Sequence, residues 1–180
     1  DCAYAPLRLA GTPSLNAAQL AQVWQLFSPN KALGLTGVRA AYVIAPPGAA
    51  AVVSALEALA PAWPVGAHGV AMLQAWVSPE VQTWLQASLR TLRDWKLSQT
   101  TLLTGFGWLL QPSQANFFCA KPPQPPNLAA LRHGHGIKLR DATSFGLPGW
   151  YRLGVLGLGS QAALRLALSD RVVFTRDNGS

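Results

Sequence analysis

The segment with the clearest chemical potential lies near the start of the chain and centres on one lysine. Lys31 stands in an apolar, glycine-containing stretch, with Ser28 three residues before it and Arg39 eight residues after it. Desolvation and nearby cations favour the neutral, nucleophilic form of a lysine amine. A hydroxyl and a guanidinium beside such an amine suit a phosphate group held next to an amine-reactive carbonyl. The same residues are also compatible with ordinary surface groups that flank a turn.

The histidines and cysteines form no pattern of this kind. His133 and His135 are separated by one glycine, but two histidines without a third ligand are more typical of a solvated loop than of a metal site. His68 is interpreted as a packing residue. Cys2 and Cys119 have neither metal-ligand spacing nor the pattern of a disulfide framework. The sequence therefore predicts no metal site and two free thiols in a reducing, cytoplasmic compartment.

The composition restricts the class of protein and the kind of ligand. The chain has 180 residues, of which 50% are hydrophobic and 12% are charged, so a disordered polar chain is excluded. No uninterrupted apolar run of about 18 residues is present, which argues against a membrane-spanning helix. The formal net charge of +7 is spread thinly, without the Lys/Arg block that follows a nucleic-acid backbone. Isolated cations of this kind fit a small anionic ligand better than nucleic acid.

Helical and strand-like segments alternate along the chain, with Pro and Gly between them. The best-defined helix begins after Ser78, because Ser78-Pro79-Glu80 combines an N-cap, a first-turn proline and a first-turn acid. Other helices are expected over residues 49–59, 128–132 and 160–168, the last of them capped by Ser160. Strands are expected over residues 38–44, 116–120, 136–140 and 151–156.

These elements suggest a chain with two parts divided near residue 75. Residues 1–75 are expected to be the end of an α/β domain, and residues 76–180 a small α+β domain. The second part reads as helix, strand, helix, strand, strand and helix. Neither part contains the strands of a complete parallel sheet.

The stretch around Lys31, SPNKALGLTGVRAAYVIAP, resembles the lysine segment of fold-type I pyridoxal-phosphate-dependent aminotransferases of class I/II. The similarity is greatest to histidinol-phosphate aminotransferases and threonine-phosphate decarboxylases. This resemblance implies that Lys31 holds pyridoxal 5'-phosphate covalently and acts in catalysis. It further implies that Arg39 and Ser28 bind the cofactor phosphate. Asn30 takes the place of a serine that many members have directly before the lysine.

Two further motifs agree with the resemblance. Asp1-Cys2-Ala3-Tyr4 is similar to the family's D-x-A-Y, which implies that Asp1 pairs with the pyridine nitrogen and Tyr4 donates to the 3-oxygen of the ring. The stretch GIKLRDATSFGLPGWYR resembles the C-terminal signature of the family. It implies that Arg152 binds the substrate carboxylate and that Arg140 helps to hold a distal phosphate. Asn116 lies in a further similar segment and is interpreted as structural or near the substrate.

The resemblance extends from Asp1 to about Leu168 and implies the C-terminal portion of a homodimeric amino-acid-biosynthesis enzyme. The leading hypothesis is an aminotransferase similar to histidinol-phosphate aminotransferase, acting on a small anionic amino-acid or phosphate-bearing substrate. The second is a threonine-phosphate decarboxylase of cobalamin biosynthesis. The third, from a different class, is a non-catalytic binding or dimerisation fragment without the N-terminal half of the site. The amino donor, the acceptor and the choice between transamination and decarboxylation stay open.

Overall fold

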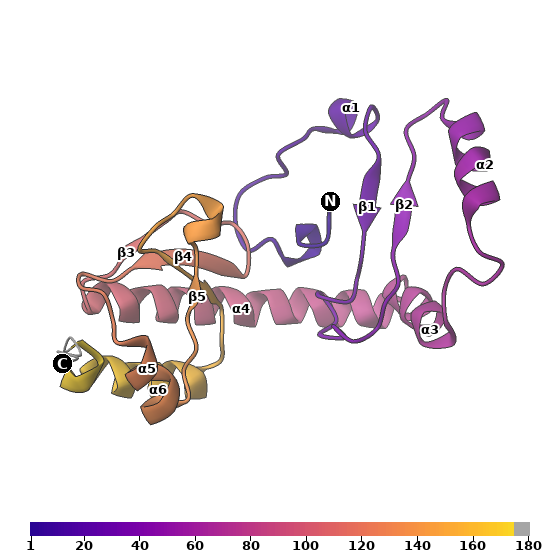
Figure 1. Ribbon diagram of the computed structural model, residues 1–180. Coiled ribbons are helices and arrows are strands. Elements are labelled where there is room, and N and C mark those ends of the chain that lie inside the picture. Colours follow the sequence, from indigo (N-terminus) through magenta and orange to yellow (C-terminus); the bar gives the residue numbers. More distant parts are fainter. Residues whose placement is uncertain (175–180) are drawn as a thin grey trace. The chain divides into compact units, whose positions relative to one another are not determined.

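The computed structural model of the chain describes residues 1–174, which fall into two compact units (Figure 1). Unit 1 comprises Asp1–Leu89 and unit 2 begins at Arg90, so the division falls inside one long helix. The division expected near residue 75 lies earlier, at the end of the preceding helix. No helix in residues 1–174 has the length and apolar character needed to cross a membrane.

Unit 1 contains short helices and a small two-stranded antiparallel sheet. Its elements are η1 (Ala5–Leu7), α1 (Ala17–Leu20), β1 (Gln25–Phe27), β2 (Tyr42–Ile44), α2 (Ala50–Leu59), α3 (Ala67–Trp76) and the first part of α4 (Pro79–Gly105). The strands pair with Phe27 opposite Tyr42, and these two rings stack at 5.2 Å. The Tyr42 hydroxyl accepts a hydrogen bond from Trp76 Nε1 at 3.3 Å, which ties α3 to the sheet.

Much of the apolar surface of unit 1 faces solvent. The helix α2, which the structure describes in full, has no buried residue, and Leu59 and Trp63 are 83% and 91% exposed. The strands are partly exposed, and Val43 of β2 is 52% exposed. Exposed apolar area of this extent is unusual for a complete domain and typical of surface that another chain segment covers.

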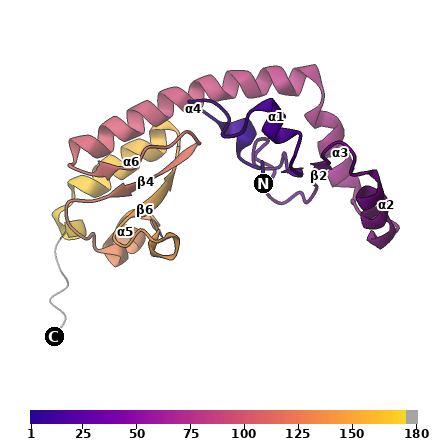
Figure 2. The ribbon, with the colours of Figure 1, turned by 90° about the horizontal axis from the view of Figure 1, so that it is seen from above.

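Unit 2 contains a four-stranded antiparallel sheet with helices packed against it (Figure 2). Its elements are the remainder of α4, β3 (Leu109–Leu110), β4 (Phe117–Lys121), α5 (Leu128–His135), β5 (Arg140–Asp141), η2 (Thr143–Phe145), β6 (Tyr151–Gly154), α6 (Leu158–Ser169) and η3 (Arg171–Phe174). The strand order is β3-β4-β6-β5. The pairing of β5 with β6 places the two candidate substrate residues, Arg140 and Arg152, on neighbouring strands.

The core of unit 2 forms where α4 and α6 meet one face of the sheet. Leu103 of α4, Phe118 of β4 and Leu164 of α6 belong to the same buried cluster. Two buried amides reinforce it: Gln99 donates to the Gly154 carbonyl and accepts from the Leu156 N–H, both at 3.0 Å. The Gln161 amide donates to the carbonyls of Trp95 and Leu156. Such hydrogen-bonded amides fix α4 relative to β6, because leaving them unpaired inside the core costs free energy.

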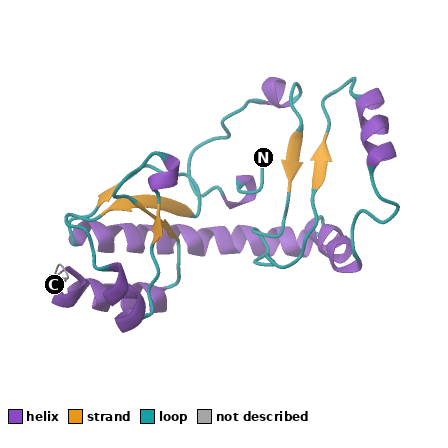
Figure 3. Ribbon diagram, in the orientation of Figure 1, coloured by secondary structure: helices purple, strands orange, loops and turns teal. Residues whose placement is uncertain are grey.

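The expected mixture of helices and strands is confirmed (Figure 3), and so is the N-terminus of α4. Ser78 Oγ accepts a hydrogen bond from the Val81 N–H at 3.3 Å. The helix expected over residues 49–59 and the strand expected over 116–120 match α2 and β4 to within one residue.

Several expected boundaries are wrong. The strand expected over residues 136–140 is reduced to β5, because α5 continues to His135 and Gly136 caps it with φ of 67°. The strand expected over 38–44 shortens to β2, and the one over 151–156 ends at Gly154. Ser160 is not the N-cap of α6, since that helix begins at Leu158 after Gly157. Neither α3 nor β1 is among the elements expected from the sequence.

Candidate functional site

Lys31 projects from a tight turn in unit 1. Pro29 and Asn30 are buried in this turn, whereas Lys31 is exposed. The Leu35 N–H donates to the Asn30 carbonyl at 2.8 Å, and Gly34 adopts a φ of 68°, a left-handed conformation that favours glycine. The turn thus buries Pro29 and Asn30 and leaves the Lys31 amine accessible to a ligand.

Tyr4 lies directly beside this amine. Lys31 Nζ is 4.6 Å from the centre of the Tyr4 ring, within the range of a cation–π contact. The two residues are distant in sequence, and the segment of Tyr4 is brought to β1 by the Cys2 N–H, which donates to the Leu26 carbonyl at 2.7 Å. The structure therefore places Tyr4, which is predicted to bind the cofactor ring, in contact with Lys31, which is predicted to hold the cofactor covalently.

Ser28 lies next to the backbone that leads to β2. Its Oγ is 2.9 Å from Asn30 Oδ1 and 3.1 Å from the carbonyl oxygen of Ala40. A hydroxyl has one proton to donate, so a phosphate at Ser28 must compete with these two acceptors. Arg39 precedes Ala40 and is exposed, which leaves its guanidinium accessible from solvent.

Asp1 is exposed, and its Oδ1 accepts a hydrogen bond from the Ala3 N–H at 2.9 Å. This local contact orients the carboxylate at the start of the same segment that carries Tyr4. The roles predicted for Asp1, Ser28 and Arg39 toward a cofactor remain predictions.

The two predicted substrate residues are direct neighbours in unit 2. Arg140 on β5 is the register partner of Arg152 on β6. Each guanidinium also lies over an aromatic ring: Arg152 Cζ is 4.0 Å from the Phe117 ring and Arg140 Cζ is 5.4 Å from the Phe145 ring. Like charges directly opposite on neighbouring strands repel. An anion that both arginines contact would relieve this repulsion.

A pocket of about 350 Å³ lies next to Arg152. It is bounded by residues 135–139, the end of β6 and the first part of α6, and its charged or titratable residues are Arg152, Lys138 and His135. No Asp or Glu of the described residues lines this pocket. Its electrostatic character therefore favours an anionic ligand over a cationic one.

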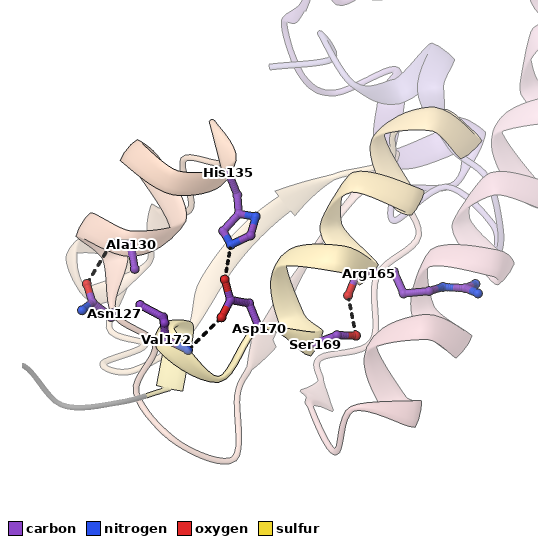
Figure 4. A network of polar contacts seen from close by, with 7 residues as sticks. All are labelled: Asn127, Ala130, His135, Arg165, Ser169, Asp170 and Val172. Atoms are coloured by element: carbon purple, nitrogen blue, oxygen red, sulfur yellow. Dashed lines mark hydrogen bonds and ion pairs between the residues drawn. The ribbon is translucent and has the colours of Figure 1, made fainter.

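His135 also contributes to the fold of unit 2. Its Nε2 is 3.0 Å from Asp170 Oδ2, and Asp170 Oδ1 accepts from the Val172 N–H at 3.0 Å (Figure 4). The N–H of Val172 and then His135 lower the pKa of Asp170 below its ordinary value. His133 is exposed, and no group of three or more His, Cys, Asp or Glu side chains that could hold a metal occurs in the described part of the chain.

Three residues that contact predicted site residues, or fix the segments next to them, within their own unit were not identified from the sequence. Phe117 lies under Arg152, and Lys96 fixes the loop before β4 through the carbonyls of Ser113 and Ala115 at 2.6 and 2.8 Å. Burial lowers the pKa of Lys96. Gly69 of α3 is the third, because it lies against the backbone of Arg39. These roles depend on contacts between distant segments, for which a single sequence carries no signal.

Asn116 immediately precedes Phe117 in the strand segment that resembles the family. Its backbone carbonyl accepts from the Val155 N–H at 2.9 Å. Its side-chain Oδ1 is buried and has no hydrogen-bond partner within the described residues. Buried acceptors are usually paired, so this unpaired oxygen is an unusual feature of the segment directly before β4, the strand that pairs with β6.

The sequence of residues 15–170 matches the family described as aminotransferase class I and II. The chain belongs to this family, whose members generally depend on pyridoxal phosphate. The expected relationship to fold-type I aminotransferases is thereby confirmed.

Three solved structures illustrate the shared fold. A decarboxylase from Sulfurospirillum multivorans is 19% identical with a TM-score of 0.78, over 97% of this chain and 47% of its own. The histidinol-phosphate aminotransferase from Clostridium acetobutylicum is 16% identical with a TM-score of 0.74, over 92% and 51%. The L-threonine-O-3-phosphate decarboxylase from Porphyromonas gingivalis is 18% identical with a TM-score of 0.64, over 92% and 52%. The chain thus spans about half the length of these three proteins.

Proposed function

We propose that this chain carries the lysine-bearing and substrate-carboxylate-binding part of a pyridoxal-phosphate-dependent aminotransferase similar to histidinol-phosphate aminotransferases. The observation that supports this most directly is the accessible Lys31 amine, 4.6 Å from the Tyr4 ring, in a chain of this family. The substrate class is an amino acid or amino-alkyl phosphate with a 2-oxo acid as its partner.

The residues of unit 1 fit the proposed cofactor by their chemistry. An accessible amine, a phenol, a carboxylate, a hydroxyl and a guanidinium come from Lys31, Tyr4, Asp1, Ser28 and Arg39. Pyridoxal phosphate, when bound, supplies an electron sink for the substrate carbon that loses its proton. Asp1 would keep the ring nitrogen protonated, Tyr4 would donate to the 3-oxygen, and Arg39 with Ser28 would hold the phosphate.

Lys31 would also move protons during the reaction. With substrate bound, the Lys31 amine would take a proton from the substrate Cα as a general base. The resulting Lys31 ammonium would then return the proton as a general acid. Tyr4 supports this exchange, because its ring attracts the ammonium form of Lys31 and keeps the side chain in place between the two transfers.

Arg152 and Arg140 would recognise the anionic ends of the substrate. A planar guanidinium binds a carboxylate through two parallel N–H···O bonds, which fixes orientation as well as charge. Because Arg140 is the cross-strand neighbour of Arg152, one substrate can contact both residues. A phosphate at the distal end of an amino-alkyl substrate would be an anionic group for Arg140 to bind.

The first test is covalent trapping of pyridoxal phosphate on the chain. The purified protein is incubated with pyridoxal phosphate, reduced with borohydride and digested, and the modified lysine is identified by mass spectrometry. We expect modification at Lys31, together with a visible absorption band that disappears in Lys31→Ala. Lys121→Ala is the matched control, because Lys121 is also exposed but lies in unit 2.

The result also separates the enzyme from the non-catalytic alternative. Modification spread over several lysines, with no absorption that depends on Lys31, would contradict a preformed cofactor site in this chain. A folded chain with that behaviour is better described as a binding or dimerisation fragment.

The second candidate reaction is decarboxylation of an amino-acid phosphate. It is supported by the similarity of the fold to decarboxylases from Sulfurospirillum multivorans and Porphyromonas gingivalis. Release of CO2 from threonine phosphate would favour it, whereas amino transfer that requires a 2-oxo acid would favour the aminotransferase.

We also propose that the protein self-associates. The exposed apolar side chains of unit 1, among them Leu59 and Trp63, supply surface for a second polypeptide. Light scattering over a range of concentrations tests this, and a monomer at every concentration would contradict it.

A further inference from the structure

The contact between Arg152 and Phe117 is a specific feature of the unit 2 sheet. Phe117 pairs with Gly154, and Arg152 pairs with Cys119, so Phe117 and Arg152 lie diagonally on the same face of β4 and β6. The Arg152 Cζ atom is 4.0 Å from the centre of the Phe117 ring. This distance is well inside the range of a cation–π contact and shorter than the 5.4 Å between Arg140 and Phe145.

The geometry of a guanidinium makes this contact compatible with ligand binding. Its N–H donors lie in the plane of the group, whereas a ring contacts its face. A contact of this face with the Phe117 ring would therefore restrict the orientation of Arg152 and leave the edge of the guanidinium for a carboxylate. A long side chain that is already ordered loses less conformational entropy when its ligand arrives.

Phe117 is itself held by a network that begins on α4. Lys96 Nζ donates to the carbonyls of Ser113 and Ala115 at 2.6 and 2.8 Å. Ser113 Oγ accepts from the Ala115 N–H at 3.2 Å and donates to the carbonyl of Phe117. The loop before β4 is thus closed onto the helix, and the backbone that carries the ring is fixed.

We propose that Phe117 is a positioning residue for Arg152 and that it orients the guanidinium for a carboxylate or phosphate ligand. Lys96 supports this role by fixing the loop that leads to Phe117. This inference rests on the proposed function of Arg152 as the anion-binding residue. Phe117 contacts the arginine and need not contact the substrate. Its effect is on the affinity for the anionic group rather than on proton transfer at Lys31.

The test reads the arginine directly, in the chain of residues 1–180 labelled with 15N-arginine. A proton above a ring face is shifted upfield, so the Nε–Hε signal of Arg152, assigned by its loss in Arg152→Gln, should lie upfield of the other arginine signals. Titration with succinate, a dicarboxylate, then gives the anion affinity. Both measurements are independent of enzymatic turnover.

We expect Phe117→Leu to abolish the upfield shift and to weaken succinate binding about threefold to tenfold. Phe117→Tyr keeps the ring and should retain both properties. Phe145→Leu is the matched control: it removes the ring beneath Arg140 and should move the Arg140 signal without moving that of Arg152.

Two results would overturn the proposal. One is an Arg152 signal without an upfield shift in the unmodified chain, a result that needs no Phe117 variant to fold. The other is an unchanged succinate affinity in a folded Phe117→Leu chain when Arg152→Gln loses binding. If Arg152→Gln itself leaves the affinity unchanged, the anion-binding role of Arg152 in the proposed function is wrong, and the NMR shift still decides the contact with Phe117.

Discussion

At the scale of single residues, a close backbone approach near the predicted phosphate site occurs at Gly69. A Cβ atom built there lies 2.7 Å from Val65 Cγ1, 2.9 Å from Ala40 Cβ and 3.2 Å from the Arg39 carbonyl oxygen. Gly69 thus allows α3 to pack against the segment that carries Arg39. The small side chain of alanine is already too large for this contact.

We predict that Gly69→Ala destabilises the chain by about 1 to 2 kcal/mol, because the clash outweighs the better helix propensity of alanine. The measurement is urea unfolding. Gly134→Ala is the matched control: Gly134 also lies in a helix, a Cβ atom placed on it meets nothing within 4 Å beyond its own helix backbone, and a small gain is expected. Equal effects of the two substitutions would contradict the close packing of α3.

Residues that act through a local motif were predictable, and residues that act through the fold were not. Lys31 stood out by its apolar, glycine-containing surroundings, and Arg152 by the signature around it. Phe117 and Lys96 have no distinctive sequence setting. Their importance appears only when β4 pairs with β6 and the loop before β4 closes onto α4.

At the scale of elements, the contact between His135 and Asp170 joins the end of α5 to the segment after α6 (Figure 4). The Val172 N–H and then His135 lower the pKa of Asp170, so the folded state favours the charged carboxylate. A depressed carboxyl pKa contributes stability above its ordinary value of about 3.9, and this contribution is lost as the pH falls through the folded-state pKa.

We therefore predict that Asp170→Asn lowers the stability of the chain at neutral pH and that the difference from the unmodified chain shrinks as the pH falls below about 4. Unfolding free energies of both proteins across this range provide the measurement. A difference that grows toward acid pH would show that the carboxylate does not stabilise the fold.

The elements also show which boundaries a sequence can specify. The N-terminus of α4 was predictable because Ser78, Pro79 and Glu80 act within one helical turn. The lengths of β2 and β5 were not, since a strand extends only as far as its partner runs alongside it. Gly136 ends α5 in a left-handed conformation and diverts the chain before β5 begins.

At the scale of the whole molecule, the two units differ in how much apolar surface they bury. Unit 2 has a sheet covered by α4 and α6 around residues such as Leu103, which is fully buried. Unit 1 buries no residue of α2 or of its two strands, and α2 is largely exposed. Because local stability follows the burial of apolar contacts, backbone amides of β4 and β6 should exchange with solvent far more slowly than those of β1 and β2.

Leu103→Ala tests whether the two units unfold separately. Removing this fully buried side chain should destabilise unit 2 by about 2 to 5 kcal/mol, and hydrogen exchange in β4 and β6 should accelerate accordingly. The exchange rates in β1 and β2 should stay unchanged, because the contacts within each unit define it as a separate compact body. Mass spectrometry of peptic fragments measures both regions in one experiment. If all four strands accelerate by the same factor, the chain unfolds as one cooperative unit, and the burial of apolar surface in unit 2 then also supports the Lys31 turn.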